Sequence, residues 1–173
     1  MRIVHLSTSD TAGGAARAAY RVHTGLVRLG HDSRMFVSTR FSRDAAVDRF
    51  FPSKDLVSKI RRRVRRRAIE RDFARYEGCL PERHELFSDD RTEHGIDMAR
   101  QVPACDLVNL HWVAGFLDHV SFFEYFARER KDVPIVWRLA DMAPLTGGCH
   151  YDVGCGRFTA RCGACAALLL GTR

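Results

Sequence analysis

Four of the chain's six cysteines lie within 17 residues, from Cys149 to Cys165, and form its densest group of potential metal ligands. Their spacing is C-x5-C-x6-C-x2-C. The last pair can bind one ion from a tight turn, and the longer intervals allow the other two to close a tetrahedral site. We therefore predict a structural Zn²⁺ site at Cys149, Cys155, Cys162 and Cys165, with His150 as a spare nitrogen ligand. Because these intervals match no standard zinc module, four reduced thiols without a metal are the alternative.

A glycine pair ends the polar loop of residues 7–14, immediately before a helix-like segment. Amides in the first turn of a helix are free to bind an anion, and glycine lets a ligand approach the backbone closely. Gly13 and Gly14, with Asp10 nearby, are therefore candidates for binding a phosphate-bearing ligand. The loop lacks the GxGxxG fingerprint of dinucleotide-binding proteins, so a plain tight turn before the helix is the alternative.

Three further candidates follow apolar, strand-like segments: His111, Trp112 and Asp141. His111 at a strand end could act as an acid, a base or a hydrogen-bond donor, although a lone histidine can also be a structural residue. Asp141 could take part in catalysis or could cap the segment that follows it. Trp112 is a candidate for contact with a substrate.

Strand-like and helix-like segments alternate along the chain, and this order predicts the fold class. We expect strands at residues 2–6, 33–38, 106–110 and 134–139, and helices at 15–29 and 116–131. Such a series is typical of an α/β fold with a doubly wound, mainly parallel, Rossmann-like sheet. All strand-to-helix loops of a parallel sheet meet at one edge, so the candidates in the three loops are expected to lie there together.

Positive charge is concentrated in residues 59–75 of a chain whose net charge is +7. Apolar residues recur there at helical spacing, which predicts an amphipathic helix with a basic face: Val57, Ile60, Val64, Ala68 and Tyr76, with Ile69 and Phe73 offset. A solvated surface and a contact with anionic lipid are both compatible with this pattern. Nucleic acid is a weaker candidate, because no aromatic platform accompanies the arginines.

Length and composition predict one globular domain with a small appendage. With 173 residues, 46% of them hydrophobic, the chain can bury a sizeable core. We expect a Rossmann-like domain at residues 1–145 and a cysteine-rich segment at 146–173. No run approaches the ~20 apolar residues of a membrane-spanning helix, and no signal peptide is visible, so we expect a cytoplasmic protein. Clustered cysteines in that compartment are typically metal ligands or free thiols.

Three separated motifs carry a family resemblance: SDTAGGAARAAYRVHTGLVRLGHDSRMFV, DLVNLHWVAGFL and PIVWRLADMAPLTGGCHYDVGCGRF with RCGAC. In this order they resemble the N-terminal, acceptor-side domain of bacterial family-4 glycosyltransferases of the GT-B fold, over nearly the whole chain except residues 41–95. The resemblance implies transfer from a nucleotide-sugar donor, without an organic cofactor, to a glycan or lipid-linked acceptor for surface polysaccharide or glycolipid synthesis. Gly13 and Gly14 would approach the donor phosphates, and His111 would lie close to the transferred sugar.

The resemblance also brings expectations about partners and completeness. Where the family commonly reads HDMWP, this chain reads ADMAP at residues 140–144, so alanine replaces a histidine and a tryptophan. Most of the donor site belongs to a second domain in the family, so we expect activity only with a donor-binding domain in trans. The basic helix would contact anionic lipid at the inner face of the membrane. The alternative function is a non-catalytic, metal-binding module whose basic helix binds anionic lipid or nucleic acid.

Overall fold

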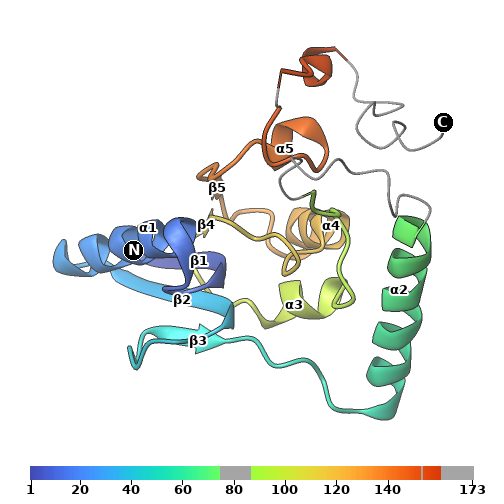
Figure 1. Ribbon diagram of the computed structural model, residues 1–173. Coiled ribbons are helices and arrows are strands. Elements are labelled where there is room, and N and C mark those ends of the chain that lie inside the picture. The colour runs from blue at the N-terminus through green and yellow to red at the C-terminus, as the bar shows by residue number, and fades with distance from the viewer. Residues whose placement is uncertain (75–86, 153, 161–173) are drawn as a thin grey trace.

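A computed structural model describes residues 1–74, 87–152 and 154–160, and within them five parallel strands form one sheet (Figure 1). The strands are β1 (Arg2–Ser9), β2 (Asp32–Thr39), β3 (Val47–Arg49), β4 (Leu107–Leu110) and β5 (Ile135–Trp137). Their order across the sheet is β3-β2-β1-β4-β5. The helices are α1 (Gly13–Arg28), α2 (Leu56–Ala74), α3 (Ile96–Gln101), α4 (His119–Glu129) and α5 (Ala143–Thr146), followed by the 3-10 turn η1 (Arg157–Thr159).

The predicted α/β class and the parallel sheet are confirmed. Each of the four predicted strands corresponds to an observed one, and every strand pair is parallel. The sequence does not predict β3 or α3, since three and six residues are too few to show a periodic pattern. Helix α4 begins three residues later than predicted, because the Asp118 carboxylate caps it by accepting a hydrogen bond from the Ser121 amide (3.2 Å).

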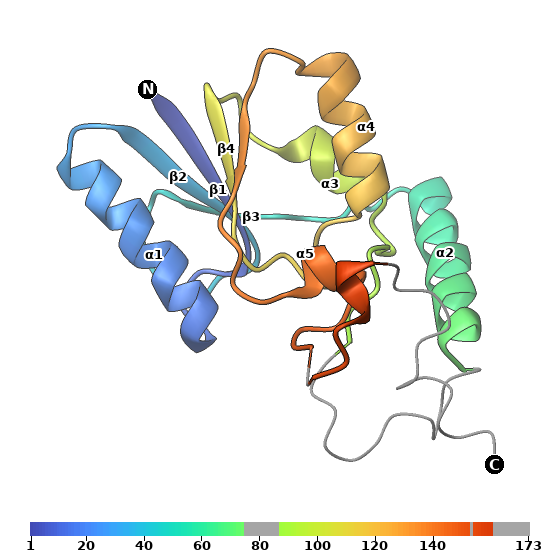
Figure 2. The same ribbon diagram turned by 90° about the horizontal axis from the view of Figure 1, so that it is seen from above.

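Helices cover both faces of the sheet, as Figure 2 shows, with α1 on one face and α3 and α4 on the other. The larger core lies on the α3 and α4 face, where Phe116, Phe122 and Met98 are fully buried. The α1 face is thinner. Ala16 and Ala19 allow α1 to approach the strands closely, and the apolar residues Met35, Val37 and Val47 lie beneath it.

Helix α2 confirms the predicted basic helix, although Arg75 and Tyr76 lie outside the described residues. None of its described residues is buried, and polar contacts join it to the domain. Arg65 donates hydrogen bonds from Nε to the Thr92 carbonyl oxygen (2.7 Å) and from a terminal nitrogen to the buried Asp118 carboxylate. Arg66 forms an ion pair with Glu93 at 3.3 Å.

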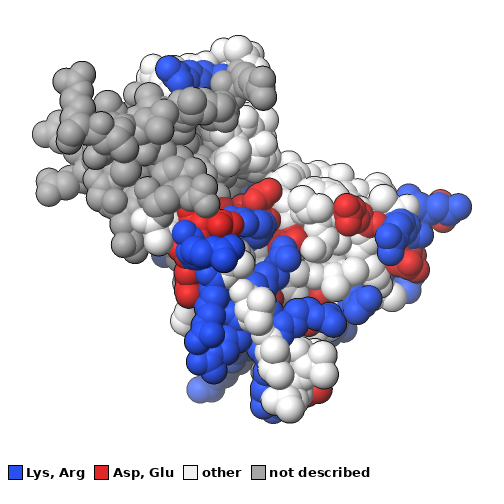
Figure 3. Space-filling model, turned by 90° about the vertical axis from the view of Figure 1, so that its right-hand side faces the viewer, with Lys and Arg blue, Asp and Glu red and all other residues white. Residues whose placement is uncertain are grey.

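The apolar stripe of α2 faces away from the domain. Its members are 55% to 72% exposed: Leu56, Val57, Ile60 and Val64. At 100° per residue Leu56 and Ile60 lie on the side of the helix opposite Arg65, which contacts the domain, and Val57 and Val64 lie on its flank. Figure 3 shows Lys and Arg side chains gathered over this part of the surface. In the described part of the chain, no helix has both the length and the apolar character required to cross a bilayer.

Candidate functional site

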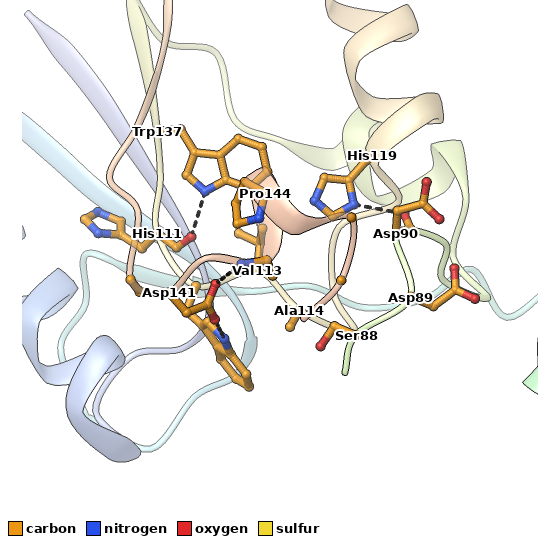
Figure 4. Close-up of a pocket in the computed structure, with 15 residues that line it drawn as sticks. Ser88, Asp89, Asp90, His111, Val113, Ala114, His119, Trp137, Asp141 and Pro144 are labelled. Carbon is orange, nitrogen blue, oxygen red and sulfur yellow. Dashed lines mark hydrogen bonds between the residues drawn. The ribbon is translucent and has the colours of Figure 1, made fainter. Parts of the chain in front are cut away.

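The loops that follow β4 and β5 enclose a pocket of about 250 Å³ at the carboxyl edge of the sheet (Figure 4). Residues 111–114 and 140–144 form two of its walls, and the remainder comes from residues 88–90, the first residue of α4, Trp137 at the end of β5 and Gly147–Gly148. Ligands of open parallel sheets bind in crevices at this edge. The pocket is therefore the first place to look for a function.

One wall of the pocket is an aromatic pair that the sequence analysis missed. The rings of His119 and Trp137 are stacked, with centroids 5.4 Å apart and planes 23° from parallel. His119 Nδ1 donates a hydrogen bond to the Asp90 carbonyl oxygen (2.9 Å), and Trp137 Nε1 donates to the His111 carbonyl oxygen (3.2 Å). Both rings are held in place by these bonds. A tryptophan that ends a strand and a histidine in the first turn of a helix were the available sequence signals.

The Asp141 carboxylate organises the loop that follows β5. It accepts hydrogen bonds from Trp112 Nε1 (2.9 Å) and from the Ala143 amide (3.0 Å) at the start of α5. It also lies 3.0 Å from His150 Nδ1. Asp141 therefore binds the first amide of the next segment, as one of the two interpretations of the sequence proposed, and it joins Trp112 in the pocket wall to the buried His150.

His150 continues this network to a third loop. It is buried, and its Nε2 lies 2.8 Å from the Ser88 hydroxyl oxygen. In a neutral ring whose Nδ1 donates to the carboxylate of Asp141, Nε2 accepts the Ser88 hydroxyl hydrogen. This is the order of a nucleophilic triad. However, the Ser88 amide donates to the Gly148 carbonyl oxygen (3.0 Å) and is not free to stabilise an oxyanion. The network joins three loops and leaves the Ser88 oxygen at the pocket edge.

His111 contributes its backbone to the pocket, whereas its side chain lies elsewhere. Figure 4 shows the imidazole turned away from Trp137 and Asp141, toward the side of the sheet that α1 covers. The side chain is 1% exposed, and its Nε2 lies 2.9 Å from Nδ1 of His5. Burial, assisted by the charge of Arg138, lowers the pKa of His111 to about 4. The structure therefore does not bring the His111 ring and the Asp141 carboxylate together.

Asp10 lies at the same edge of the sheet but does not line the pocket. Its buried carboxylate accepts hydrogen bonds from the amides of Phe41 (2.9 Å) and Ser42 (2.7 Å). Burial opposes ionisation of this group, but the hydrogen bonds prevail and lower its pKa. Asp10 thereby fixes the loop after β1 to the loop after β2.

Gly13 and Gly14 are exposed at the start of α1, beyond the pocket lining. Gly13 has a φ of +85°, a conformation that favours glycine. Among the described residues no side chain caps this helix, and its first turn carries no acidic residue. The first amides of a 16-residue helix are thus open to an anion. Thr8 connects this loop to the pocket, since its amide and hydroxyl donate to the carbonyl oxygens of Trp112 (2.8 Å) and Ala114 (2.9 Å).

The predicted zinc site lies partly outside the described residues. Cys149 is half-buried and Cys155 is exposed, whereas Cys162 and Cys165 belong to residues 161–173, which the structure does not describe. Within the described ranges, no group of three or more His, Cys, Asp or Glu side chains is placed to hold a metal ion. The zinc site therefore stays a prediction.

Comparisons with protein-family models, with curated proteins and with solved structures give no match for this chain. Two clusters of candidate residues lie at the carboxyl edge of the sheet, namely the pocket and the start of α1.

Proposed function

We propose that this chain is the acceptor-side domain of a nucleotide-sugar-dependent glycosyltransferase, and that the pocket binds a sugar of its glycan or lipid-linked acceptor. The observation that carries the proposal is the stacked pair of His119 and Trp137. The C–H groups on one face of a pyranose form an apolar patch, which packs on an aromatic surface of this kind. Held by hydrogen bonds at their edges, the two rings need little reorganisation when a ligand binds.

The size and the polar rim of the pocket also favour a sugar. A cavity of about 250 Å³ is just below the ~300–1,000 Å³ typical of sites for drug-sized ligands, which suits a ligand as small as a monosaccharide. Ser88 and Asp141 place hydroxyl and carboxylate oxygens beside the aromatic wall. Sugar hydroxyls can donate to these oxygens while the ring stacks.

The start of α1 supports a nucleoside diphosphate as the second ligand. As a sugar leaves its nucleotide, negative charge builds on the diphosphate, and helix amides stabilise it without reorganisation. Gly13 and Gly14 leave open space around their Cα atoms, so a phosphate can approach the backbone there. The two clusters then have separate tasks, with the acceptor in the pocket and the donor phosphates at α1.

Nuclear magnetic resonance separates these two tasks in one experiment. The sequence contains two tryptophans, so the indole resonances of Trp112 and Trp137 can be assigned with Trp137→Phe. We expect a panel of methyl hexosides to shift the Trp137 indole signal, and UDP or GDP to shift the amide signals of Gly13 and Gly14. Trp137→Ala should weaken hexoside binding by up to about tenfold. The exposed Phe41→Ala is the matched control and should leave it unchanged.

The proposal would be refuted if neither the hexosides nor the nucleotides changed the signals assigned to their sites. If every hexoside leaves the indole signals in place, the pocket is not an acceptor site. If the nucleotides leave the glycine amides unchanged, the donor assignment is wrong as well, and a non-catalytic module becomes the better reading.

The outward stripe of α2 favours membrane contact as an additional function. Four exposed apolar side chains of α2 lie close to the exposed arginines Arg63 and Arg67 on the helix surface. Apolar side chains that enter the acyl boundary, beside cations that meet anionic headgroups, are typical of an interfacial helix. Nucleic acid offers no apolar phase to such a stripe. We therefore place contact with an anionic membrane, and a lipid-linked acceptor, on this face of α2.

A further inference from the structure

A chain of buried polar side chains crosses the otherwise apolar layer between α1 and the sheet. His5 and His23 are completely buried, His111 is 1% exposed and Ser33 is 3% exposed. Burying such groups is costly unless each finds a hydrogen-bond partner. In this layer they partner one another, although they come from β1, α1, β2 and the end of β4.

The contacts form one continuous path. His111 Nε2 lies 2.9 Å from His5 Nδ1, and His5 Nε2 lies 3.1 Å from the Ser33 hydroxyl oxygen. The same oxygen lies 2.9 Å from His23 Nδ1. His23 Nε2 then lies 3.6 Å from Oδ2 of Asp44, which is a longer, mainly electrostatic contact. The path thus ends at a carboxylate near the surface.

All three rings of this path are neutral near pH 7. Burial, together with the neighbouring His111 and His23, lowers the pKa of His5 to about 3. Burial likewise lowers the pKa values of His111 and His23. A neutral imidazole has one N–H and one lone pair, so a ring that accepts at one nitrogen donates at the other. The Ser33 hydroxyl has one hydrogen, so it can accept from both histidines but donate to only one of them. The bond between His5 and His111 can point in either of two directions, which place the His111 hydrogen on different nitrogens.

Asp44 selects one of these directions because a carboxylate can only accept hydrogen bonds. A hydrogen bond from the Ala46 amide is the main cause of its lowered pKa, and the Tyr20 hydroxyl donates to Oδ2 (2.9 Å). An ionised Oδ2 attracts a hydrogen on His23 Nε2 and repels a lone pair there. His23 Nδ1 must then accept from Ser33.

We propose that Asp44, acting through His23, Ser33 and His5, holds His111 in its Nε2–H tautomer. Ser33 accepts from His5 Nε2, and His5 Nδ1 accepts from His111 Nε2. Nδ1 of His111 keeps its lone pair, and no described residue is its partner. A ligand that reaches this nitrogen must donate a hydrogen bond, as a hydroxyl does and an ionised phosphate oxygen does not. Asp44, His23, Ser33 and His5 are positioning residues in this scheme.

The tautomer can be measured directly, without any ligand, by long-range ¹H–¹⁵N correlation spectra of the full chain. Protonated and unprotonated ring nitrogens resonate far apart, so each ring shows which nitrogen carries hydrogen. We expect all three buried rings in the Nε2–H form at pH 7, at a ratio of at least about ten to one, which one hydrogen bond to a charged group supports. An Nδ1–H or doubly protonated His111 would overturn the proposal. Since no sugar or nucleotide is used, this outcome is independent of the proposed function.

Asp44→Asn tests whether the carboxylate sets the direction. Oδ1 accepts from the Ala46 amide, so the asparagine oxygen stays there and its NH₂ group faces His23 Nε2 as a donor. His23 should then reverse and donate to Ser33, which frees the Ser33 hydroxyl to donate to His5, so His111 should lose its preference for the Nε2–H form. Tyr20→Phe removes a hydroxyl from the same carboxylate and should leave the tautomer unchanged. A reversed His23 beside an unchanged His111 would show that the rings are not coupled. If the variant does not fold, the spectra of the unaltered chain still decide the tautomer.

Discussion

The lowered pKa values of His5 and His111 predict a large loss of folding stability on mild acidification. The pKa of His5 is about 3 and that of His111 is about 4 in the folded chain, against about 6.5 in an unfolded one. Between these values the unfolded state binds more protons, so the free energy of unfolding falls as the pH falls below 6.5. The loss ends at about pH 4 for His111 and at about pH 3 for His5, where the folded rings also become protonated.

The magnitude follows from the size of the pKa shifts. Each ring contributes about 1.4 kcal/mol for each pH unit between its unfolded and folded pKa values. From pH 6.5 to pH 5 this is about 2 kcal/mol for each ring, and about 4 kcal/mol for His5 and His111 together. A domain of this size is typically stable by about 5–15 kcal/mol, so the effect is a substantial part of the total. Carboxylates titrate mostly below this window.

Urea unfolding monitored by tryptophan fluorescence at pH 7, 6 and 5 measures this loss. His5→Gln removes one of the two titrating rings, and it should reduce the pH dependence by about 1.4 kcal/mol for each pH unit. His31→Gln, at a half-exposed position between α1 and β2, is the control for the removal of a histidine outside the buried path. A free energy of unfolding that stays constant within ~1 kcal/mol from pH 7 to pH 5 would refute the reasoning, whether or not the His5 variant folds.

Three further predictions concern α2 and the cysteines. Arg65→Ala should destabilise the chain by about 2 kcal/mol in urea unfolding, because the buried Asp118 loses a charged hydrogen-bond donor. Arg67 is exposed, so the control Arg67→Ala should change stability by less than ~0.5 kcal/mol. Val64→Asp should weaken sedimentation with anionic vesicles by about tenfold while unfolding curves stay unchanged; equal binding would exclude the stripe as the contact. Cys162→Ser should reduce the zinc found by elemental analysis of purified protein, and unaltered zinc content would remove this cysteine from the ligand set.

The sheet is the part of the fold that local patterns could predict. Four short apolar segments separated by helical segments of suitable length leave few alternatives to a parallel sheet, and each became a strand. The basic helix was predicted for the same reason. The orientation of α2 relative to the domain could not be predicted, because helical spacing shows which residues form the apolar stripe but not what that stripe contacts. The contact that orients it joins Arg65 to Asp118, 53 residues away.

The candidate site was only partly accessible to sequence reasoning. The prediction that the loops after β1, β4 and β5 share one edge is sound, because parallel strands place their carboxyl ends together. Which side chains enter the pocket is a separate matter. His119 and Trp137 form its aromatic wall from different elements, and the His111 ring points into the layer beneath α1.

By itself, the sequence determined the fold class, the loops that meet at one edge and the position of the basic helix, because these depend on periodic patterns over a few residues. Only the tertiary structure decided the burial, the hydrogen-bond partners and the charge of each polar side chain. His111 and its partner His5 are 106 residues apart in the chain, and His5 and its partner Ser33 are 28 residues apart. Burial and hydrogen bonding set the charge and the tautomer of such groups, and both arise only when distant segments pack together.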